Sequence, residues 1–127
     1  MIFPNIPVKD LKKSMDFFGQ LGFTYNDKFT DENAACMIVN DTACVMLLTE
    51  PFYLSFTTKG LPDTSKTTEV MLAISLENKE KVDETLSKAL SMGATEGRIE
   101  DLGFMYSRSF HDLDGHIWEF FWMDENV

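Results

Sequence analysis

The feature of this sequence that most constrains its fold is an order of predicted elements that occurs twice. Each half opens with a short apolar segment, continues with an amphipathic helical pattern, and closes with three strand-like segments. The first helical pattern follows Asp10 and stops at Gly22, and the second follows Asn78 and stops at Gly93. Asp and Asn are favoured helix N-caps, and glycine is favoured just past a helix C-terminus. The repeat therefore predicts two βαβββ modules in one chain.

Apolar alternation and turn residues place the predicted strands. In the first half they cover residues 2–8, 23–29, 34–39 and 43–49, and in the second half residues 69–76, 95–99, 104–111 and 116–123. We expect a single domain over residues 1–127, with a first module at 1–50, a linker arm at 51–67 and a second module at 68–127.

The linker arm has an unusual composition. It contains Pro51, Gly60 and Pro62 and many Thr, Ser and Lys residues, as linkers do, but it opens with Phe52, Tyr53 and Phe56. Because exposed clusters of large apolar side chains usually mark contact sites, we expect this arm to be buried against the core, a ligand or a second subunit. This expectation supports a homodimer.

Charge and cysteine usage exclude several classes of partner. The 127 residues include 21 acidic and 11 basic side chains, which gives a net charge of −10. Such an excess repels nucleic acids and anionic membranes, and it tolerates a cationic small ligand better than an anionic one. The N-terminal residues lack the basic segment of a signal peptide. Cys36 and Cys44 have no metal-binding spacing, which is typical of free thiols in a cytoplasmic protein.

Two segments carry a resemblance to a known family. They are Val8-Lys9-Asp10-Leu11 and the closing Asp112-Leu113-Asp114-Gly115-His116-Ile117-Trp118-Glu119. Together with the two modules, they resemble the vicinal oxygen chelate superfamily of glyoxalase, bleomycin resistance and extradiol dioxygenase proteins. The segment Gly103-Phe104-Met105-Tyr106-Ser107-Arg108-Ser109-Phe110 resembles the branch of predicted lactoylglutathione lyases. The resemblance implies an α+β fold in which two βαβββ modules form a curved mixed sheet with a concave ligand cavity.

The resemblance also implies where a metal would bind. In the glyoxalase pattern four strand positions supply the ligands, and here those positions hold Phe3, Leu47, Met71 and Glu119, with Asn5 replacing Phe3 if the alignment shifts by two residues. Only Glu119 can bind a hard or borderline metal. Neither glyoxalase I nor extradiol dioxygenase activity is therefore expected. No cofactor is predicted, and room is left only for a weakly bound divalent metal.

Strand alternation predicts which side chains share the cavity with Glu119. Ile117 and Phe121 should face the cavity, while Trp118, Phe120 and Trp122 should face the helices. A two-residue turn at residues 113–114 would place Arg108 opposite Glu119, with Tyr106 on the same face. A bulge in that turn would shift the register by one and move Arg108 outside. Asp112 and Asp114 are interpreted as turn residues rather than calcium ligands.

Three functions remain open on the sequence. The first is a lyase or isomerase with little or no dependence on metal, in which Glu119, Arg108 and Tyr106 are the catalytic candidates: Arg108 would bind a carboxylate or carbonyl, and Glu119 would orient the substrate or act as a base. The second is a bleomycin-resistance-type protein that sequesters a cationic, aromatic drug. The third is a regulatory module with a vestigial cavity. The candidate ligand-binding residues are Asn5, Phe3, Leu47, Met71, Phe52, Tyr53 and Phe121.

Overall fold

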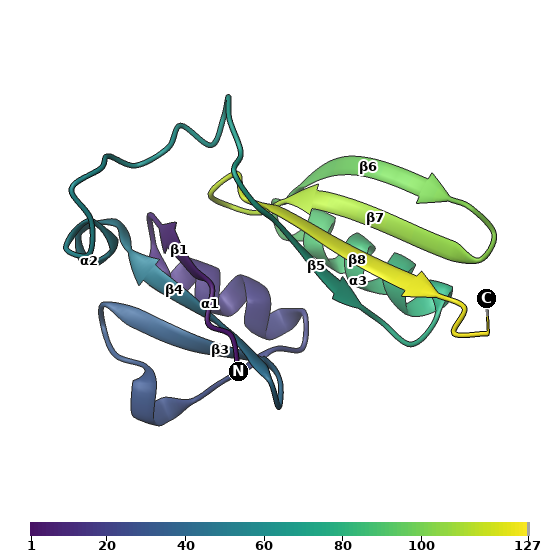
Figure 1. Ribbon diagram of the computed structural model, residues 1–127, viewed down its shortest axis with the longest axis horizontal. Coiled ribbons are helices and arrows are strands. Elements are labelled where there is room, and N and C mark those ends of the chain that lie inside the picture. The colour runs from purple at the N-terminus through teal and green to yellow at the C-terminus, as the bar shows by residue number, and fades with distance from the viewer. Residues whose placement is uncertain (127) are drawn as a thin grey trace. The chain divides into compact units, whose positions relative to one another are not determined.

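The computed structural model describes residues 1–126, and its chain divides into two compact units, one over Met1–Pro62 and one from Asp63 onward. Each unit contains a four-stranded mixed sheet with a helix packed on it (Figure 1). The fold class is thus α+β with two βαβββ modules, as predicted. No helix among the described residues is long and apolar enough to cross a membrane.

The first unit has strand order β1-β4-β3-β2, with β1 parallel to β4. Its elements are β1 (Asn5–Val8), α1 (Leu11–Gln20), β2 (Thr24–Tyr25), the 3₁₀ helix η1 (Asp27–Phe29), β3 (Ala34–Asn40), β4 (Ala43–Thr49) and α2 (Glu50–Leu54). Asp10 caps α1 by accepting a hydrogen bond from the Lys13 amide at 3.1 Å, and Gly22 ends the helix with a φ of +107°. Both features match the predicted helix ends.

Two strands of the first unit are shorter in the structure than predicted from the sequence. The strand predicted at residues 2–8 begins at Asn5, and before it only Ile2 forms an isolated bridge, to Ala43. The strand predicted at residues 23–29 stops at Tyr25. The Asn26 side chain then accepts a hydrogen bond from the Lys28 amide at 3.0 Å and starts η1, because an Asn side chain competes with the strand ladder for backbone donors.

The second unit repeats this order with strands β5-β8-β7-β6, and β5 runs parallel to β8. Its elements are β5 (Met71–Ser75), α3 (Lys79–Ser91), β6 (Thr95–Asp101), β7 (Met105–His111) and β8 (Ile117–Met123). Asn78 caps α3 through the Lys81 amide at 2.7 Å, and Gly93 has a φ of +106°. The second half therefore has the predicted elements, with bounds that differ by a few residues.

In each unit, one face of the sheet packs against a long helix, α1 in the first unit and α3 in the second. The opposite face carries no long helix among the described residues. In the first unit the apolar residues between sheet and α1 include Ile6, Val8, Met37, Leu47, Phe17 and Phe18. In the second unit those between sheet and α3 include Phe110, Trp118, Phe120, Val82, Leu86 and Ala89. Burial of these side chains on one face fixes the alternation of every strand, and so determines which residues the opposite face presents.

The predicted linker arm is partly helical. Its first residues form α2, with Pro51 in the first turn, where the missing amide costs no hydrogen bond. Phe52 packs edge-on against Phe56 with ring centroids 5.0 Å apart, yet Phe56 stays 70% exposed. Phe52 and Tyr53 are half-buried, so Phe56 is the aromatic side chain of the arm that its own unit leaves uncovered.

Candidate functional site

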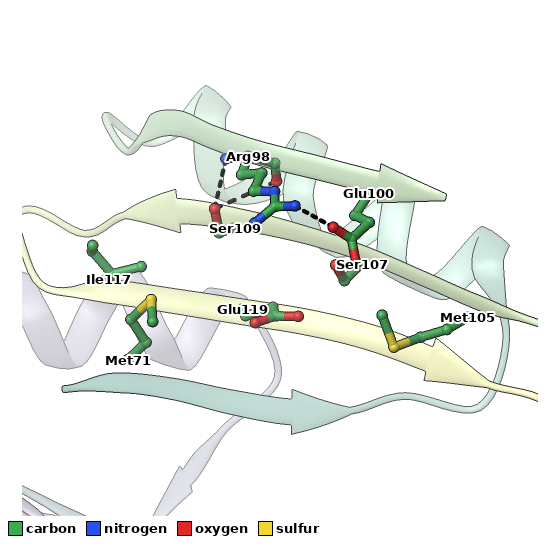
Figure 2. A pocket seen from close by; sticks show the side chains of 8 residues that line it. All are labelled: Met71, Arg98, Glu100, Met105, Ser107, Ser109, Ile117 and Glu119. Carbon is green, nitrogen blue, oxygen red and sulfur yellow. Dashed lines mark hydrogen bonds and ion pairs between the residues drawn. The ribbon is translucent and has the colours of Figure 1, made fainter. Parts of the chain in front are cut away.

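The candidate site is a cavity of about 230 Å³ on the open face of the second sheet (Figure 2). All four strands of that sheet contribute to it. Its lining residues are Met71, Ile117, Glu119, Met105, Ser107, Ser109, Arg98 and Glu100. The cavity thus combines apolar side chains (Met71, Met105 and Ile117) with the Glu119 carboxylate and the hydroxyls of Ser107 and Ser109. The Arg98–Glu100 ion pair lies at its rim.

Glu119 lies on β8 and points into this cavity, the direction that the resemblance implies. Ile117 lines the cavity with it, and their neighbours Trp118 and Phe120 are buried on the helix side. Among residues 1–126, the half-buried Glu119 carboxylate has no hydrogen-bond or ion-pair partner. A carboxylate that has lost part of its hydration without gaining a partner attracts a cation or a hydrogen-bond donor.

The predicted register between β7 and β8 is wrong by one residue. Ser109 lies opposite Glu119, and Arg108 lies opposite Phe120. The turn has three residues instead of two: the Gly115 amide donates to Asp112 at 3.1 Å, and Gly115 itself adopts a φ of +85°. A turn followed by one left-handed glycine inserts an extra residue, and a shift of one residue moves every side chain of β7 to the opposite face.

The carboxylate of Asp112 stabilises this turn. It accepts the backbone amides of Asp114 at 2.9 Å and His116 at 3.0 Å, and the Trp118 indole at 2.8 Å. Burial raises the pKa of Asp112 above its ordinary value. Asp112 is thus a turn residue, as predicted.

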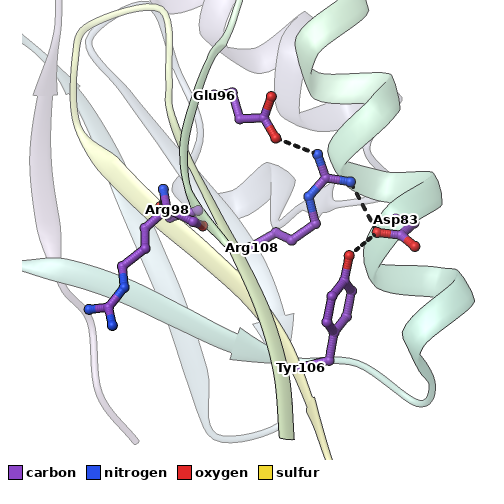
Figure 3. Close-up of polar contacts among 6 residues, drawn as sticks. Asp83, Glu96, Arg98, Tyr106 and Arg108 are labelled. Atoms are coloured by element: carbon purple, nitrogen blue, oxygen red, sulfur yellow. Dashed lines mark hydrogen bonds and ion pairs between the residues drawn. The ribbon is translucent and has the colours of Figure 1, made fainter. Parts of the chain in front are cut away.

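Arg108 and Tyr106 consequently lie on the helix side of the sheet, away from Glu119 (Figure 3). The Arg108 guanidinium donates to Asp83 of α3 at 3.0 Å and to Glu96 of β6 at 2.7 Å, and the Tyr106 hydroxyl donates to Asp83 at 2.6 Å. The hydrogen bond from Tyr106, together with Arg108, lowers the pKa of Asp83. The predicted ion pair between Arg108 and Glu119 is therefore wrong, and these side chains join α3 to the sheet.

A bulge in β6 brings a different arginine to the cavity. The pairing of β6 with β7 shifts between Glu96 and Ile99, which leaves Gly97 and Arg98 together opposite Ser109. Arg98 leaves the sheet on the face opposite to Arg108 (Figure 3) and forms an ion pair with Glu100 at the cavity rim. This pair was not predicted from the sequence, although an isolated glycine within a strand, here Gly97, is a signal for a bulge.

Two of the ligand residues predicted in the first unit line another cavity, of about 370 Å³. Asn5 and Tyr53 form it with residues of β4 and of the arm that follows α2, namely Leu48, Phe56 and Thr57. Phe52 lies beside this cavity through its contact with Phe56.

The remaining predicted ligand residues have different positions. Leu47 is fully buried on the helix side, and Met46, not Leu47, pairs with Asn5 in the sheet. The prediction for Leu47 is thus wrong by one residue, since its side chain faces α1. Phe3 precedes β1 and is half exposed, and Met71 lines the cavity of Glu119. Phe121 lies opposite Ser75, two residues beyond Glu119 on the same face.

The donor set does not fit a divalent metal. Among residues 1–126, no three His, Cys, Asp or Glu side chains gather in a way that could hold a metal ion. The positions that supply metal ligands in the resemblance hold Phe3 or Asn5, Leu47 or its neighbour Met46, Met71 and Glu119, and Met46 is the one that pairs with Asn5 in the sheet. One carboxylate with two thioethers does not provide the oxygen and nitrogen donors that Zn²⁺, Ni²⁺ or Mn²⁺ prefer.

Comparison with known proteins supports the fold. Residues 1–40 match the family model described as bleomycin resistance protein-like N-terminal. No curated protein matches the sequence. Among solved structures, a hypothetical protein from S. aureus is 24% identical and superposes with a TM-score of 0.82, covering 95% of this chain and 92% of its own.

Structures with named activities match at lower identity. A glyoxalase-related enzyme from Fulvimarina pelagi is 17% identical with a TM-score of 0.81, covering 96% of this chain and 86% of its own. The fosfomycin resistance protein FosX from Listeria monocytogenes is 16% identical with a TM-score of 0.69, covering 99% of this chain and 94% of its own. At these identities the likeness shows that the chain has the fold of the glyoxalase and bleomycin resistance proteins.

Proposed function

We propose that this chain is a protein of the vicinal oxygen chelate superfamily that binds a small organic cation over Glu119, without the superfamily's usual metal. The observation that carries the proposal is the partnerless carboxylate of Glu119 inside a cavity. An ammonium about 4 Å from a carboxylate gains roughly 4 kcal/mol of attraction near a protein surface, before the cost of desolvation. Met71, Met105 and Ile117 would contact the apolar part of the ligand.

Binding without chemistry is the function that these residues support best. Glu119 has no His, Lys or Tyr partner in the cavity that would tune it as an acid or base, and the donor set does not fit a metal. The match of residues 1–40 to the bleomycin resistance model agrees with a binding role. We do not extend the proposal to lactoylglutathione lyase activity, because the metal-ligand positions are apolar except for Glu119.

Calorimetric titration tests this proposal directly. Hexylamine and benzylamine serve as probes at pH 7.4 and low salt, with Glu119→Gln as the variant. We expect at least one probe to bind, and the variant to weaken it tenfold or more, because the neutral amide keeps the shape and removes the charge. Glu125→Gln, which removes the same charge at an exposed position, should leave affinity unchanged. No binding by any probe, or equal affinity in both variants, would contradict the proposal.

Catalysis by Glu119 is the second candidate, and the same partnerless carboxylate favours it, since a carboxylate with no ion pair can accept a proton from a bound substrate. The assay is hydrogen–deuterium exchange at carbon for any compound that binds, followed by NMR. Exchange that Glu119→Gln abolishes even when the variant is saturated with ligand would establish a base. Binding without exchange would support sequestration.

A further inference from the structure

Gly97 allows the bulge that turns Arg98 toward the cavity. A Cβ atom at this position would lie 2.3 Å from the Ser109 hydroxyl oxygen and 3.2 Å from the Ser109 carbonyl carbon and oxygen. The backbone atoms cannot move aside as a flexible side chain could, so the bulge in β6 depends on glycine. The Ser109 hydroxyl fills the space, where it accepts the Arg98 amide at 2.7 Å. Bulges redirect side chains in this way, and here the redirected side chain is Arg98.

The two arginines of the chain differ in what their guanidinium groups still offer. Arg108 is 14% exposed, and its two terminal nitrogens are occupied by Asp83 and Glu96. Arg98 is 80% exposed, and among the described residues its ion pair is with Glu100 alone. Exposed pairs of this kind contribute little free energy, and a guanidinium has five donors. Arg98 can therefore exchange Glu100 for an anionic group of a ligand at small cost.

Glu119 and Arg98 stand at two sides of the same cavity (Figure 2). Glu119 lies on β8 and Arg98 on β6, with β7 between them. Two strand spacings separate their backbones by roughly 10 Å, which leaves room for a ligand whose charges are several bonds apart. Met71, Ile117 and Met105 supply apolar contacts along the cavity.

We propose that the ligand is a small zwitterion with an ammonium bound by Glu119, a carboxylate bound by Arg98, and an apolar chain between them. This inference rests on the proposed function, because it assumes that Glu119 binds the cation. A cavity of about 230 Å³ suits a molecule of amino-acid size rather than a large drug. Arg98 is then the residue that selects for the anionic group, and Glu100 competes with the ligand for it.

Pairs of probes that differ only in a carboxylate distinguish binding of the anionic group from binding of the ammonium. Calorimetry compares 6-aminohexanoate with hexylamine and 4-aminobutanoate with butylamine. We expect at least one zwitterion to bind tenfold or more tightly than its amine. Arg98→Gln should abolish the preference for that zwitterion over its amine. Glu100→Gln should tighten zwitterion binding, since it removes the competitor.

The outcomes distinguish this inference from the proposed function. If the amines bind through Glu119 but neither zwitterion binds more tightly than its amine, or if Arg98→Gln keeps the preference, the zwitterion inference is overturned and the cation site stands. If neither amines nor zwitterions bind, or if Glu119→Gln changes nothing, both are overturned. Circular dichroism of each variant checks that the fold is retained.

Discussion

At the scale of single residues, Arg98 and Arg108 carry the same charge on neighbouring strands but have opposite roles. Arg108 holds α3 and β6 to the sheet through Asp83 and Glu96, and its Nε atom is buried without a partner in the described part of the chain. Arg98 lies at the rim of the cavity. The difference between these environments predicts that substitutions at the two positions will affect different properties.

We expect Arg108→Ala to lower the free energy of unfolding by about 1–2 kcal/mol, less than for a fully buried pair because Asp83 and Glu96 are half exposed. Arg98→Ala should change it by under about 0.5 kcal/mol, as exposed pairs do. Urea denaturation at pH 7 measures both. Equal losses in the two variants would contradict the assignment of Arg108 to the fold and Arg98 to the cavity.

Tyr25 provides a second residue-scale prediction. Its hydroxyl donates to the Met15 carbonyl at 2.9 Å, and burial, with a contribution from Asp16, raises its pKa to about 12. Because the folded pKa exceeds the ordinary value of about 10, the stabilisation is complete below pH 10 and is lost as pH rises from about 10 to about 12. Absorbance titration at alkaline pH should show a tyrosine transition near pH 12 that Tyr25→Phe removes. A transition complete by pH 10.5 would refute this.

At the scale of elements, replacing Gly97 or Gly19 by alanine should change the free energy of unfolding in opposite directions, although each is an isolated glycine within a helix or strand. Gly97→Ala places a Cβ against Ser109 and should cost about 1–3 kcal/mol, as overpacking does. Gly19 lies within α1 with nothing within 4 Å of an added Cβ, so Gly19→Ala should stabilise by about 0.5–1 kcal/mol. Thermal unfolding of both variants tests the pair. A Gly97→Ala protein as stable as the parent would show that the bulge does not require glycine.

The elements also show what could be predicted from the sequence. Asp10, Asn78, Gly22 and Gly93 mark helix ends through local hydrogen bonds and backbone conformation, so both long helices were predicted correctly. It was also predictable that Ile117 shares the face of Glu119, because alternation along one strand depends only on that strand.

The pairing between strands was harder to predict, because it depends on how many residues a turn or bulge contains. Gly115 adds one residue to the β7–β8 turn, and that single residue moves Arg108 from the cavity to the helix side. The bulge at Gly97 adds another and brings Arg98 to the cavity. The resemblance pointed to Glu119, but the arginine that lines its cavity is Arg98 and not Arg108, because the extra turn residue reversed the faces of β7 and the bulge turned Arg98 toward the cavity.

At the scale of the whole molecule, the chain exposes large apolar side chains that its own units do not cover. In the first unit Phe56 is 70% exposed, and Leu54 beside it on α2 is also exposed. A net charge of −10 favours solubility and opposes association of copies, so a contact that forms must be driven by apolar burial. The arm that contains Phe56 is the segment for which a second subunit was expected from the sequence.

We therefore predict a homodimer in which the arm after α2 contacts the second copy. Light scattering at about 10 μM should give twice the 14.5 kDa chain mass. Phe56→Ser should shift the protein toward monomer, because apolar burial contributes about 25 cal/mol per Å² and a phenylalanine supplies much of it in a small contact. Phe29→Ser, which removes a phenylalanine that is similarly exposed elsewhere in the same unit, should leave the mass unchanged. The prediction is contradicted if the parent protein is a monomer, or if the dimer survives Phe56→Ser and dissociates in Phe29→Ser.

In that case the cavity formed by Asn5, Tyr53 and Phe56 would be open to solvent, and Phe56 would contact ligand rather than protein.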